Sequence, residues 1–314
     1  MCDVVSFGET MVMMDPVENG PIKYIHSFRK KIGGAESNFA IGLSRLGHDA
    51  GWFSKLGDDP SGAYVRSVIA GERVDTEQVM FTDEAPTGVM FKERISRTET
   101  HVHYNRTGSA ASRMTPDELP DAYIKDAQHL HITGITPILS SSCRKTVDRA
   151  FQLASDSGVR VSFDPNVRMK LWEGEETRET LIEFIERAEV VIISVDEADQ
   201  LFDERNPDRI ADRVLSERPK LVAVTMDEEG ARAFAEDDTA HHPGFEVDVV
   251  DTVGAGDAFC AGFVSAVQEE QSLEEMVVRA NLCGAHATTV PGDMEGLPTR
   301  EDLASIREGS KFLR

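Results

Sequence analysis

The chain is poor in cysteine and in long apolar runs. Its 314 residues include four cysteines, Cys2, Cys143, Cys260 and Cys283, which stand far apart and form no CxxC pair. This spacing argues against a disulfide framework or a cysteine zinc site and favours a reducing cytoplasm. Even the longest purely aliphatic runs, such as Val190–Ile193, are short, and no basic segment followed by a long apolar one opens the sequence. We therefore expect neither a membrane span nor a secretory signal.

Basic residues, and lysine above all, are scarce. Asp and Glu number 56 against 33 Lys and Arg, which gives a formal net charge of -23, and only 10 of the 33 are lysines. Such a surface repels phosphate backbones, so nucleic-acid binding is not expected. An acidic, lysine-poor chain favours a salt-rich, halophilic setting, in which self-repulsion is screened. The alternative is an ordinary acidic cytoplasmic enzyme.

Several common catalytic motifs are also missing. The sequence has no GxxxxGK[ST] phosphate loop and no GxGxxG after an apolar run. It has no GxSxG nucleophile elbow, which weakens a hydrolase interpretation.

What the chain does contain is an alternation of short apolar runs and amphipathic stretches. The runs predicted as strands are Val4–Gly8, Gly51–Leu56, Leu130–Thr133, Arg160–Asp164, Val190–Ser194 and Leu221–Thr225. The stretches predicted as helices are Ser37–Leu46, Ser61–Ala70, Ser141–Ser157, Arg178–Arg187 and Asp208–Glu217. This alternation predicts an α/β fold with a mainly parallel sheet covered by helices on both faces.

Two segments depart from that alternation. Pro21–Lys31 and Gly88–Tyr104 alternate apolar and polar residues with no helix between them, as half-exposed antiparallel strands do. We expect them to form a small sheet that leaves the main domain and acts as a lid.

A glycine-rich turn lies near the C-terminus. Asp251-Thr252-Val253-Gly254-Ala255-Gly256-Asp257 precedes a predicted helix from Ala258 to about Glu269. Glycines let successive N–H groups point at one centre, and a helix N-terminus adds partial positive charge, so an anion pocket is predicted. Asp257 at its edge could accept a proton from a hydroxyl. The alternative is that Asp257 only caps the helix.

A second glycine pair lies near the N-terminus. Gly33-Gly34-Ala35-Glu36-Ser37-Asn38 opens a predicted helix, where paired glycines allow close approach of a ligand and Asn38 offers both donor and acceptor to a polyol. A simple tight turn before a helix would explain the same residues. Gly57–Gly62, with the sequence GDDPSG, follows the next predicted strand.

These three elements, in this order and spacing, resemble the PfkB (ribokinase-like) family of carbohydrate kinases over essentially the whole chain. The resemblance implies one kinase domain over residues 1–314, with lid segments at about 11–32 and 86–108. It implies ATP as co-substrate with Mg²⁺. It also implies Asp257 as the catalytic base and Gly254, Ala255 and Gly256 as the anion hole, with Thr252 beside them.

The sugar side is more specific. Tyr104-Asn105-Arg106, followed by Gly108-Ser109-Ala110, resembles a segment of the 2-keto-3-deoxygluconate kinases of this family. A further match is the run of residues 164–168, DPNVR. We expect Arg106 and Arg168 to converge on a sugar-acid carboxylate, because guanidinium forks suit its two oxygens. The alternative is two solvated surface arginines. The resemblance assigns the remaining sugar contacts to Gly34, Asn38, Tyr104 and Asp293, and Asp293 has the alternative of a plain turn residue.

The nucleotide side departs from the family pattern. Ser194 stands where the family commonly has Asn, whereas Glu197, three residues later and assigned near the metal, is kept. Asp227 stands where Gly is usual. The cofactor-binding residues implied by the resemblance are Ser194, Glu197, Thr225, Asp227, Gly230, Gly254, Gly256, Asn281 and Ala285.

The combined hypothesis is a cytoplasmic kinase that transfers the γ-phosphoryl of ATP to the primary C6 hydroxyl of 2-keto-3-deoxygluconate. Its partners would be a small sugar acid and a nucleotide, with no nucleic acid and no membrane, and we expect a homo-oligomer. The alternatives are a fructokinase or ketohexokinase of the same fold, and a catalytically silent nucleotide-binding sensor.

Overall fold

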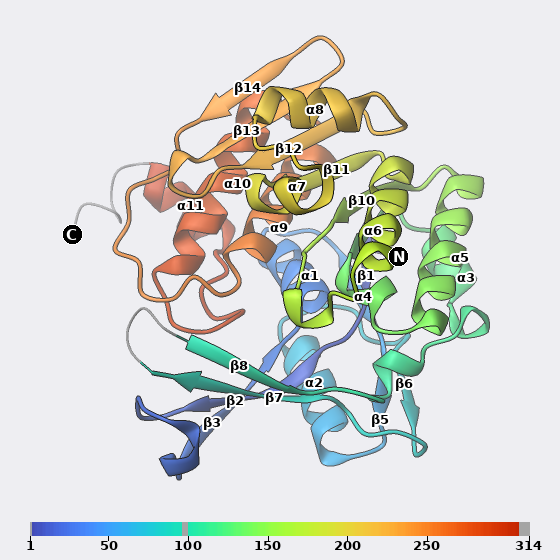
Figure 1. Cartoon of the computed structure of the whole chain (residues 1–314), viewed down its shortest axis with the longest axis vertical. Helices are drawn as coiled ribbons and strands as arrows, with labels where there is room; N and C mark the ends of the chain where they lie inside the picture. Colours follow the sequence, from blue (N-terminus) through green and yellow to red (C-terminus); the bar gives the residue numbers. More distant parts are fainter. Residues whose placement is uncertain (1, 96–99, 308–314) are drawn as a thin grey trace.

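One large sheet organises the chain, whose computed structural model describes residues 2–95 and 100–307 (Figure 1). Its strand order is β14-β13-β12-β11-β10-β9-β1-β4. The strands are β1 (Val4–Phe7), β4 (Ala50–Phe53), β9 (His129–Thr133), β10 (Arg160–Asp164), β11 (Val190–Ser194), β12 (Leu221–Thr225), β13 (Ala231–Ala235) and β14 (Thr239–His242). Pairing is parallel from β4 to β12, and β13 and β14 add an antiparallel edge. The predicted mainly parallel sheet is confirmed.

Strand β11, near the middle of the large sheet, is apolar on both faces. Along β11, Val190 and Ile192 belong to one buried apolar cluster, whereas Val191 and Ile193 belong to another. Successive side chains of a strand point to opposite faces, so an uninterrupted aliphatic run is what a strand covered on both sides requires.

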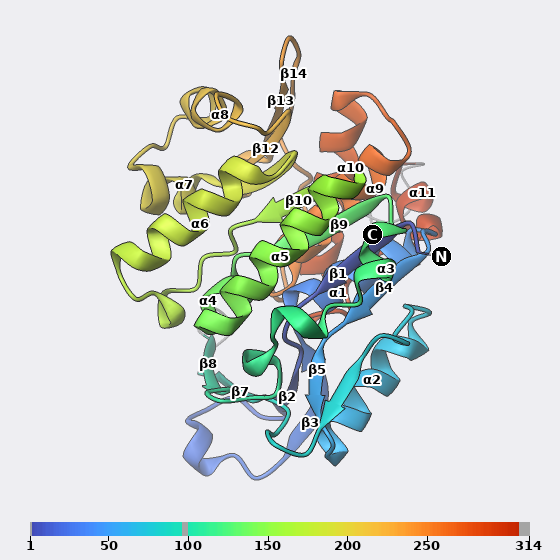
Figure 2. The ribbon, with the colours of Figure 1, turned by 90° about the vertical axis from the view of Figure 1, so that its right-hand side faces the viewer.

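Helices cover both faces of this sheet (Figure 2). One cluster is built from α1 (Ala35–Arg45), α9 (Ala255–Gln268), α10 (Leu273–Thr288) and α11 (Arg300–Arg307). The other is built from α3 (Asp121–Lys125), α5 (Ser141–Ser157), α6 (Glu175–Arg187), α7 (Val195–Phe202) and α8 (Pro207–Leu215), with the short α4 (Ile135–Ile138) beside α5 and α6. The five predicted helices therefore exist, and all but Ser61–Ala70 cover this sheet as expected.

Local sequence sets the helix bounds, as α5 illustrates. Its N-cap Ser140 accepts a hydrogen bond through Oγ from the Cys143 N–H at 3.1 Å. Its C-cap Gly158 has φ +71°, the left-handed conformation that a glycine adopts at little cost. Buried Val147, Ala150 and Ala154 recur along one side of the helix and pack against the sheet.

A second, smaller sheet lies beside the first (Figure 1). Its order is β3-β2-β7-β8, formed by β2 (Met11–Pro16), β3 (Phe28–Gly33), β7 (Val89–Arg94) and β8 (Thr100–Asn105). The pairs β2–β3 and β7–β8 are antiparallel, and β2 pairs with β7 in parallel. Helix α2 (Pro60–Gly71) packs against β2. We call this unit the small sheet.

The structure corrects three details of the predicted elements. The run Gly51–Leu56 is divided, because β5 (Lys55–Gly57) leaves the large sheet and pairs with β6 (Met80–Thr82). Within Pro21–Lys31, residues Ile22–Tyr24 form a 3-10 helix, and the strand starts only at Phe28. Strand β2 was not predicted, since nearly all of its residues are buried and it shows no polar alternation.

No helix among residues 2–95 and 100–307 is long and apolar enough to cross a membrane.

Candidate functional site

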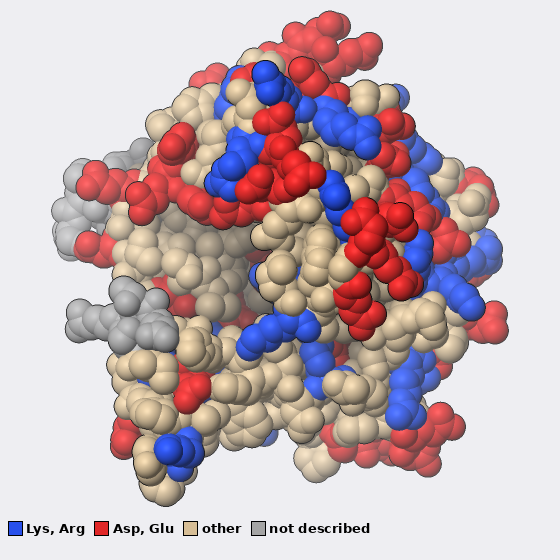
Figure 3. Space-filling model, in the orientation of Figure 1, with Lys and Arg blue, Asp and Glu red and all other residues tan. Residues whose placement is uncertain are grey.

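The predicted site residues gather at the carboxyl ends of the parallel strands. The predicted residues Ser194 and Thr225 end β11 and β12, and the predicted Arg168 follows the end of β10 at Asp164. The N-termini of α1 and α9 meet at the same edge, since Asn38 of α1 donates from Nδ2 to Asp257 Oδ2 of α9 at 2.8 Å. This edge is where open parallel sheets bind ligands. Figure 3 shows the surface hollowed there, between the region of α9 and strand β8.

The turn before α9 can be built only with glycine at its first position. Gly254 is the N-cap of α9 with φ +81°, and a Cβ added there would lie 2.2 Å from the carbonyl oxygen of Asp293. Around Gly256 an added Cβ would meet nothing within 4 Å, so the space over the first helical turn is open. The exposed Gly256 thus leaves the first turn of α9 accessible to a ligand, as an anion site at a helix N-terminus requires.

Asp257 does not act as the cap of α9. The N-cap is Gly254, and no side chain makes a cap hydrogen bond there. Asp257 is buried instead, and burial raises its pKa to about 7, helped by the negative charges of Asp293 and Glu36. The hydrogen bond from Asn38 and the charge of Arg168 act in the opposite direction. A carboxylate with a pKa near 7 suits a general base at neutral pH.

A second buried carboxylate lies close to Asp257. Burial, then the charges of Glu197 and Asp257, raise the pKa of Asp164 to about 8. Asp164 accepts hydrogen bonds at 2.9 Å from the backbone N–H and from the side-chain amide of Asn166. Neighbouring carboxylates that repel one another form a place where a bound cation would be favourable.

Glu197 is already bonded within the protein. Its Oε2 accepts from the N–H and the hydroxyl of Ser194 at 2.9 and 2.8 Å, and its Oε1 accepts from the Val167 N–H at 2.9 Å. Ser194 and Glu197 thereby form the capping box of α7. A carboxylate has about four acceptor positions, so roughly one remains for a metal or its water. The contribution of Ser194 seen in the structure is to hold Glu197.

The structure does not give the two predicted arginines equal environments. Arg106 is buried, and its Nε donates to Glu9 Oε2 at 2.6 Å, so its charge is already balanced. Arg168 is exposed, and among the described residues no carboxylate lies within ion-pair distance of it. Its charge nevertheless lowers the pKa of both Asp164 and Asp257. The two arginines therefore differ: the charge of Arg106 is paired with Glu9, whereas Arg168 has no carboxylate partner among the described residues. Their convergence on a substrate carboxylate stays a prediction.

Glu9 was missed by the sequence reasoning. It follows β1 and is buried, and it accepts from Ser109 Oγ as well as from Arg106. The signal available was a carboxylate two residues after a mainly apolar strand, because a charge that is buried in such a place must have a partner. Tyr104 lies under the guanidinium of Arg106, 5.4 Å from the ring centre.

Several buried side-chain oxygens near the turn have no hydrogen-bond partner among the residues that the structure describes. They are Glu36 Oε2, Asn38 Oδ1 and Asn166 Oδ1. Leaving a buried acceptor unsatisfied costs about 1–3 kcal/mol, so hydroxyl groups or waters would be favourable partners. Gly34, the N-cap of α1, lies against the backbone of Glu9. A Cβ added to Gly34 would be 2.6 Å from the Glu9 carbonyl oxygen.

Asp293 is held by a lysine that the sequence reasoning also missed. Lys92 of β7 lies with Nζ 3.2 Å from Asp293 Oδ1 and 3.6 Å from Asp251 Oδ2. Asp293 is buried. Gly33 lies so close to it that a Cβ added to Gly33 would be 2.4 Å from Asp293 Oδ2. Asp293 is thus not a solvated turn residue.

The predicted nucleotide residues lie at the other side of the turn. Thr225 ends β12, and Asp227 has φ +49°, which explains why glycine is usual at this position. An added Cβ on Gly230 would lie 2.1 Å from the His242 carbonyl oxygen, to which Asn281 of α10 donates at 3.1 Å. Ala285 lies one turn later on α10. The hairpin β12–β13, strand β14 and α10 thus meet at this edge.

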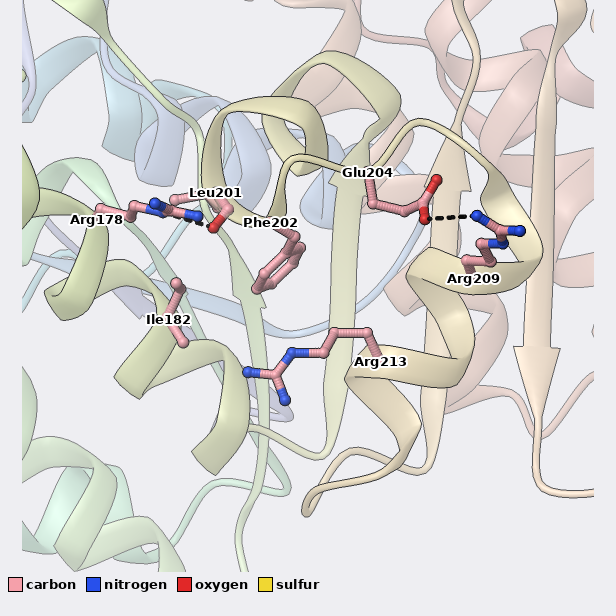
Figure 4. A pocket seen from close by; sticks show the side chains of 7 residues that line it. All are labelled: Arg178, Ile182, Leu201, Phe202, Glu204, Arg209 and Arg213. Carbon is pink, nitrogen blue, oxygen red and sulfur yellow. Dashed lines mark hydrogen bonds and ion pairs between the residues drawn. The ribbon is translucent and has the colours of Figure 1, made fainter.

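A cavity of about 310 Å³ lies elsewhere, between α6, α7 and α8 (Figure 4). It is lined by Arg178, Arg209 and Arg213 around Phe202. Each arginine forms an ion pair with at least one carboxylate, so the cavity is not a free cationic site.

Comparison with known proteins assigns the chain. The model of the family described as pfkB family carbohydrate kinase matches residues 1–300. The chain belongs to the PfkB family of carbohydrate kinases. One relative, the 2-dehydro-3-deoxygluconokinase of Bacillus subtilis, is 39% identical over 97% of this chain and 95% of its own. Fructokinase-1 of Zea mays is 34% identical over 97% of both chains.

Solved structures agree with this assignment. A protein described as a ribokinase II from E. coli, in complex with ATP and Mg²⁺, has a TM-score of 0.91 at 26% identity and covers 98% of this chain and 100% of its own. The protein is therefore an ATP-dependent PfkB carbohydrate kinase with the ribokinase-like fold.

Proposed function

We propose that this PfkB kinase transfers the γ-phosphoryl of ATP to the primary C6 hydroxyl of 2-keto-3-deoxygluconate, giving 2-keto-3-deoxy-6-phosphogluconate. The observation that carries the proposal is the uncommitted charge of Arg168 beside Asp257, at the edge where α1 and α9 meet. A guanidinium with no protein partner suits a carboxylate of the substrate, which a neutral sugar lacks. The identity of 39% to a 2-dehydro-3-deoxygluconokinase supports the same substrate.

In this mechanism Asp257 accepts the proton of the attacking hydroxyl as the phosphoryl group is transferred. Asn38 holds that carboxylate by its 2.8 Å hydrogen bond, which fixes the direction from which the hydroxyl approaches. The N–H groups at Gly254–Gly256, of which Gly256 borders open space, would stabilise the charge of the moving phosphoryl group.

The nucleotide is expected against Thr225, Asp227, Gly230, Asn281 and Ala285, next to this turn. Glu197 and Asp164 would hold Mg²⁺, directly or through water, since Glu197 keeps about one acceptor position and Asp164 lies in an excess of negative charge. When bound, Mg²⁺ would supply positive charge that offsets the negative charge developing on the phosphates.

The whole chain would act as a single kinase domain, with segments of about 11–32 and 86–108 as its lid. The small sheet supports this, because its buried Lys92 and Arg106 reach the site from β7 and from just beyond β8. A lid of this kind excludes water from the transferring phosphoryl group.

A fructokinase is the second candidate. It is favoured by the pairing of Arg106 with Glu9, which removes half of the predicted carboxylate clamp, and by the 34% identity to a fructokinase. The neutral sugar would then occupy the same edge without using Arg168.

An ADP-release assay over a sugar panel tests the proposal. The panel contains 2-keto-3-deoxygluconate, its C4 epimer, fructose and a control without sugar, and kcat/KM is compared across it. We expect 2-keto-3-deoxygluconate to exceed fructose by at least tenfold, and Asp257→Asn to abolish the signal. A higher kcat/KM for fructose would replace the proposal by the second candidate, and no sugar-dependent ADP release would indicate a silent nucleotide sensor.

A further inference from the structure

Lys92 is a buried cation that bridges two parts of the molecule. It comes from β7 of the small sheet and is 2% exposed. Its Nζ lies 3.2 Å from Asp293 Oδ1 and 3.6 Å from Asp251 Oδ2, and both partners belong to the part of the chain that surrounds α9. Burying an ammonium group costs several kcal/mol unless anions offset it, so Lys92 is buried because of these two carboxylates.

The two carboxylates are themselves attached to the glycine turn. Asp251 accepts from the N–H of Val253 at 3.2 Å and from the N–H of Gly292 at 3.3 Å. The carbonyl of Asp293 is in such close contact with Gly254 that no other residue fits there. A shift of either aspartate would therefore move the backbone from which Asp257 and the anion-hole amides project.

A second lysine makes the same crossing. Lys31 of β3 lies with Nζ 3.0 Å from Glu295 Oε1 and donates to the Pro291 carbonyl at 3.2 Å. The strand register places Lys31 and Met90 beside Met13, so Lys31 and Lys92 lie on the same face of the small sheet. Both lysines thus attach this face to residues 291–295, and Lys92 is the more deeply buried of the two.

We propose that Lys92 is a positioning residue of the kinase reaction: by pairing with Asp251 and Asp293, it couples docking of the small sheet to placement of the Gly254–Asp257 turn. The kinetic part of this proposal rests on the function proposed above, since it takes Asp257 as the base. The coupling itself is a property of the protein without substrate.

The coupling is measured by backbone hydrogen exchange without ligands. Lys92→Met keeps an unbranched side chain of similar length and removes the charge. We expect backbone hydrogen exchange faster than in the wild type both in residues 89–94 and in residues 251–257. Lys92→Arg restores a cation and should return both segments toward the wild-type rates. Lys30→Met is the matched control, because Lys30 is an exposed lysine on the other face of the small sheet and contacts Tyr64.

The kinetic test uses the sugar that the wild type phosphorylates best. Misplacing a reacting group by about 1 Å costs up to about 10²-fold, so Lys92→Met should lower kcat by about ten- to a hundredfold. The Kd for ATP, measured by titration, should change much less than kcat, because only Gly254 and Gly256 of the predicted nucleotide contacts belong to the turn. The contacts predicted at Thr225, Asp227, Gly230, Asn281 and Ala285 lie outside it. Lys92→Arg should recover part of kcat.

A folding defect is separated by a charge-neutral variant. Lys92→Met combined with Asp251→Asn and Asp293→Asn leaves no unpaired buried charge, and its melting temperature should exceed that of Lys92→Met alone. We still expect fast exchange at residues 251–257 in this triple variant, because the bridge is absent.

The outcomes separate the two proposals. Exchange that rises in residues 89–94 alone, or in neither segment, would overturn the role of Lys92 whichever sugar is used. A normal kcat for Lys92→Met would also overturn it. A wild type that prefers fructose overturns the proposed substrate alone, since the exchange experiment needs no sugar.

Discussion

Asp257 is both buried and the proposed catalytic base, so its pKa should determine how the kinase activity depends on pH. Burial raises its pKa to about 7, and a base works only when ionised, so activity should be present above that pH and fall below it. We predict an acid limb near pH 7 in kcat/KM, where an ordinary aspartate would give one near 4. The measurement is kcat/KM from pH 5 to 9 at saturating ATP.

A variant of Arg168 tests whether the acid limb of kcat/KM reports the ionisation of Asp257. Its positive charge lowers the pKa of Asp257, so Arg168→Ala should move the acid limb to higher pH, whatever it does to the maximum. An unmoved limb, or one near pH 4 in the wild type, would contradict the assignment of the limb to Asp257.

Removal of the base gives a second prediction. Asp257→Asn keeps the shape and the contact with Asn38, and it removes the proton acceptor. We expect kcat to fall by about 10²- to 10⁴-fold, the range typical of general-base loss. Nucleotide Kd, measured by titration calorimetry, should change little, and near-normal turnover would show that another group takes the proton.

The two arginines should respond differently to truncation. Arg168→Ala removes a charged partner of the substrate alone, so kcat/KM for 2-keto-3-deoxygluconate should fall about ten- to a hundredfold while fructose turnover is barely affected. Arg106→Ala leaves Glu9 buried without its cation and should cost about 3–5 kcal/mol of unfolding free energy and reduce activity on both sugars.

A double variant checks the second half of this prediction. Arg106→Ala with Glu9→Gln removes both charges and should recover stability, as measured by urea unfolding. Equal losses on both sugars for Arg168→Ala would mean that Arg168 serves the fold or the nucleotide, and the carboxylate contact would be abandoned.

At the scale of elements, strands β9 and β10 share a buried histidine pair. His129 Nε2 and His131 Nδ1 lie 2.7 and 2.8 Å from the single hydroxyl of Ser162. His131 also stacks on Phe39 of α1, with ring centres 3.7 Å apart. Burial lowers the pKa of His129 to about 3 and that of His131 well below its usual value. Both rings are therefore neutral in the folded protein at neutral pH.

This pair predicts acid sensitivity of the large sheet. The folded pKa of His129 lies below its unfolded value of about 6.5, so the unfolded chain gains the proton first and stability falls as the pH drops below about 6.5. At pH 5 the loss from His129 is about 2 kcal/mol. In His129→Gln, the difference in unfolding free energy between pH 7 and pH 5, measured in urea, should shrink by about that amount. An unchanged difference would contradict it.

At the scale of the whole molecule, the net charge of -23 is the dominant property. Acidic side chains are spread over the face seen in Figure 3 and outnumber the basic ones in the sequence. The described residues form many ion pairs, such as Arg205 with Asp196 and Asp199, but an excess of carboxylates remains. Self-repulsion of that excess destabilises the compact state, and salt screens it.

We therefore predict that the melting temperature rises with KCl into the molar range. The Debye length falls to about 3 Å at 1 M salt, so repulsion between carboxylates on the surface is largely removed. Differential scanning fluorimetry from 0.1 to 3 M KCl measures this. A flat or falling curve would favour an ordinary acidic enzyme and would leave the kinase activity untouched.

Local patterns were sufficient to predict most of the elements and the position of the turn. Short apolar runs predict β11 and β12 to the residue, because a strand that is buried on both faces needs a nearly uninterrupted apolar run. Strands β9 and β10, in which apolar residues alternate with His or Ser, are predicted to within one residue at each end. The turn before α9 can be recognised in the sequence because Gly254 cannot be replaced: its φ is +81°, and a side chain there would collide with the carbonyl of Asp293. Strand β2 was not predicted, because its residues are buried on both faces and its sequence shows no alternation of apolar and polar residues.

Pairings between distant residues were decided only by the tertiary structure. Asn38 meets Asp257 across 219 positions, and Arg106 meets Glu9 across 97. The sequence placed Arg106 near a substrate carboxylate, but it could not show that a carboxylate of the chain already occupies that guanidinium. The sequence also gave no sign that Lys92 is buried, because a lone lysine in a strand is normally solvated. Local periodicity determines which face of an element is buried, whereas only the packing of elements against one another determines which buried charges meet, and through them the electrostatics of the site.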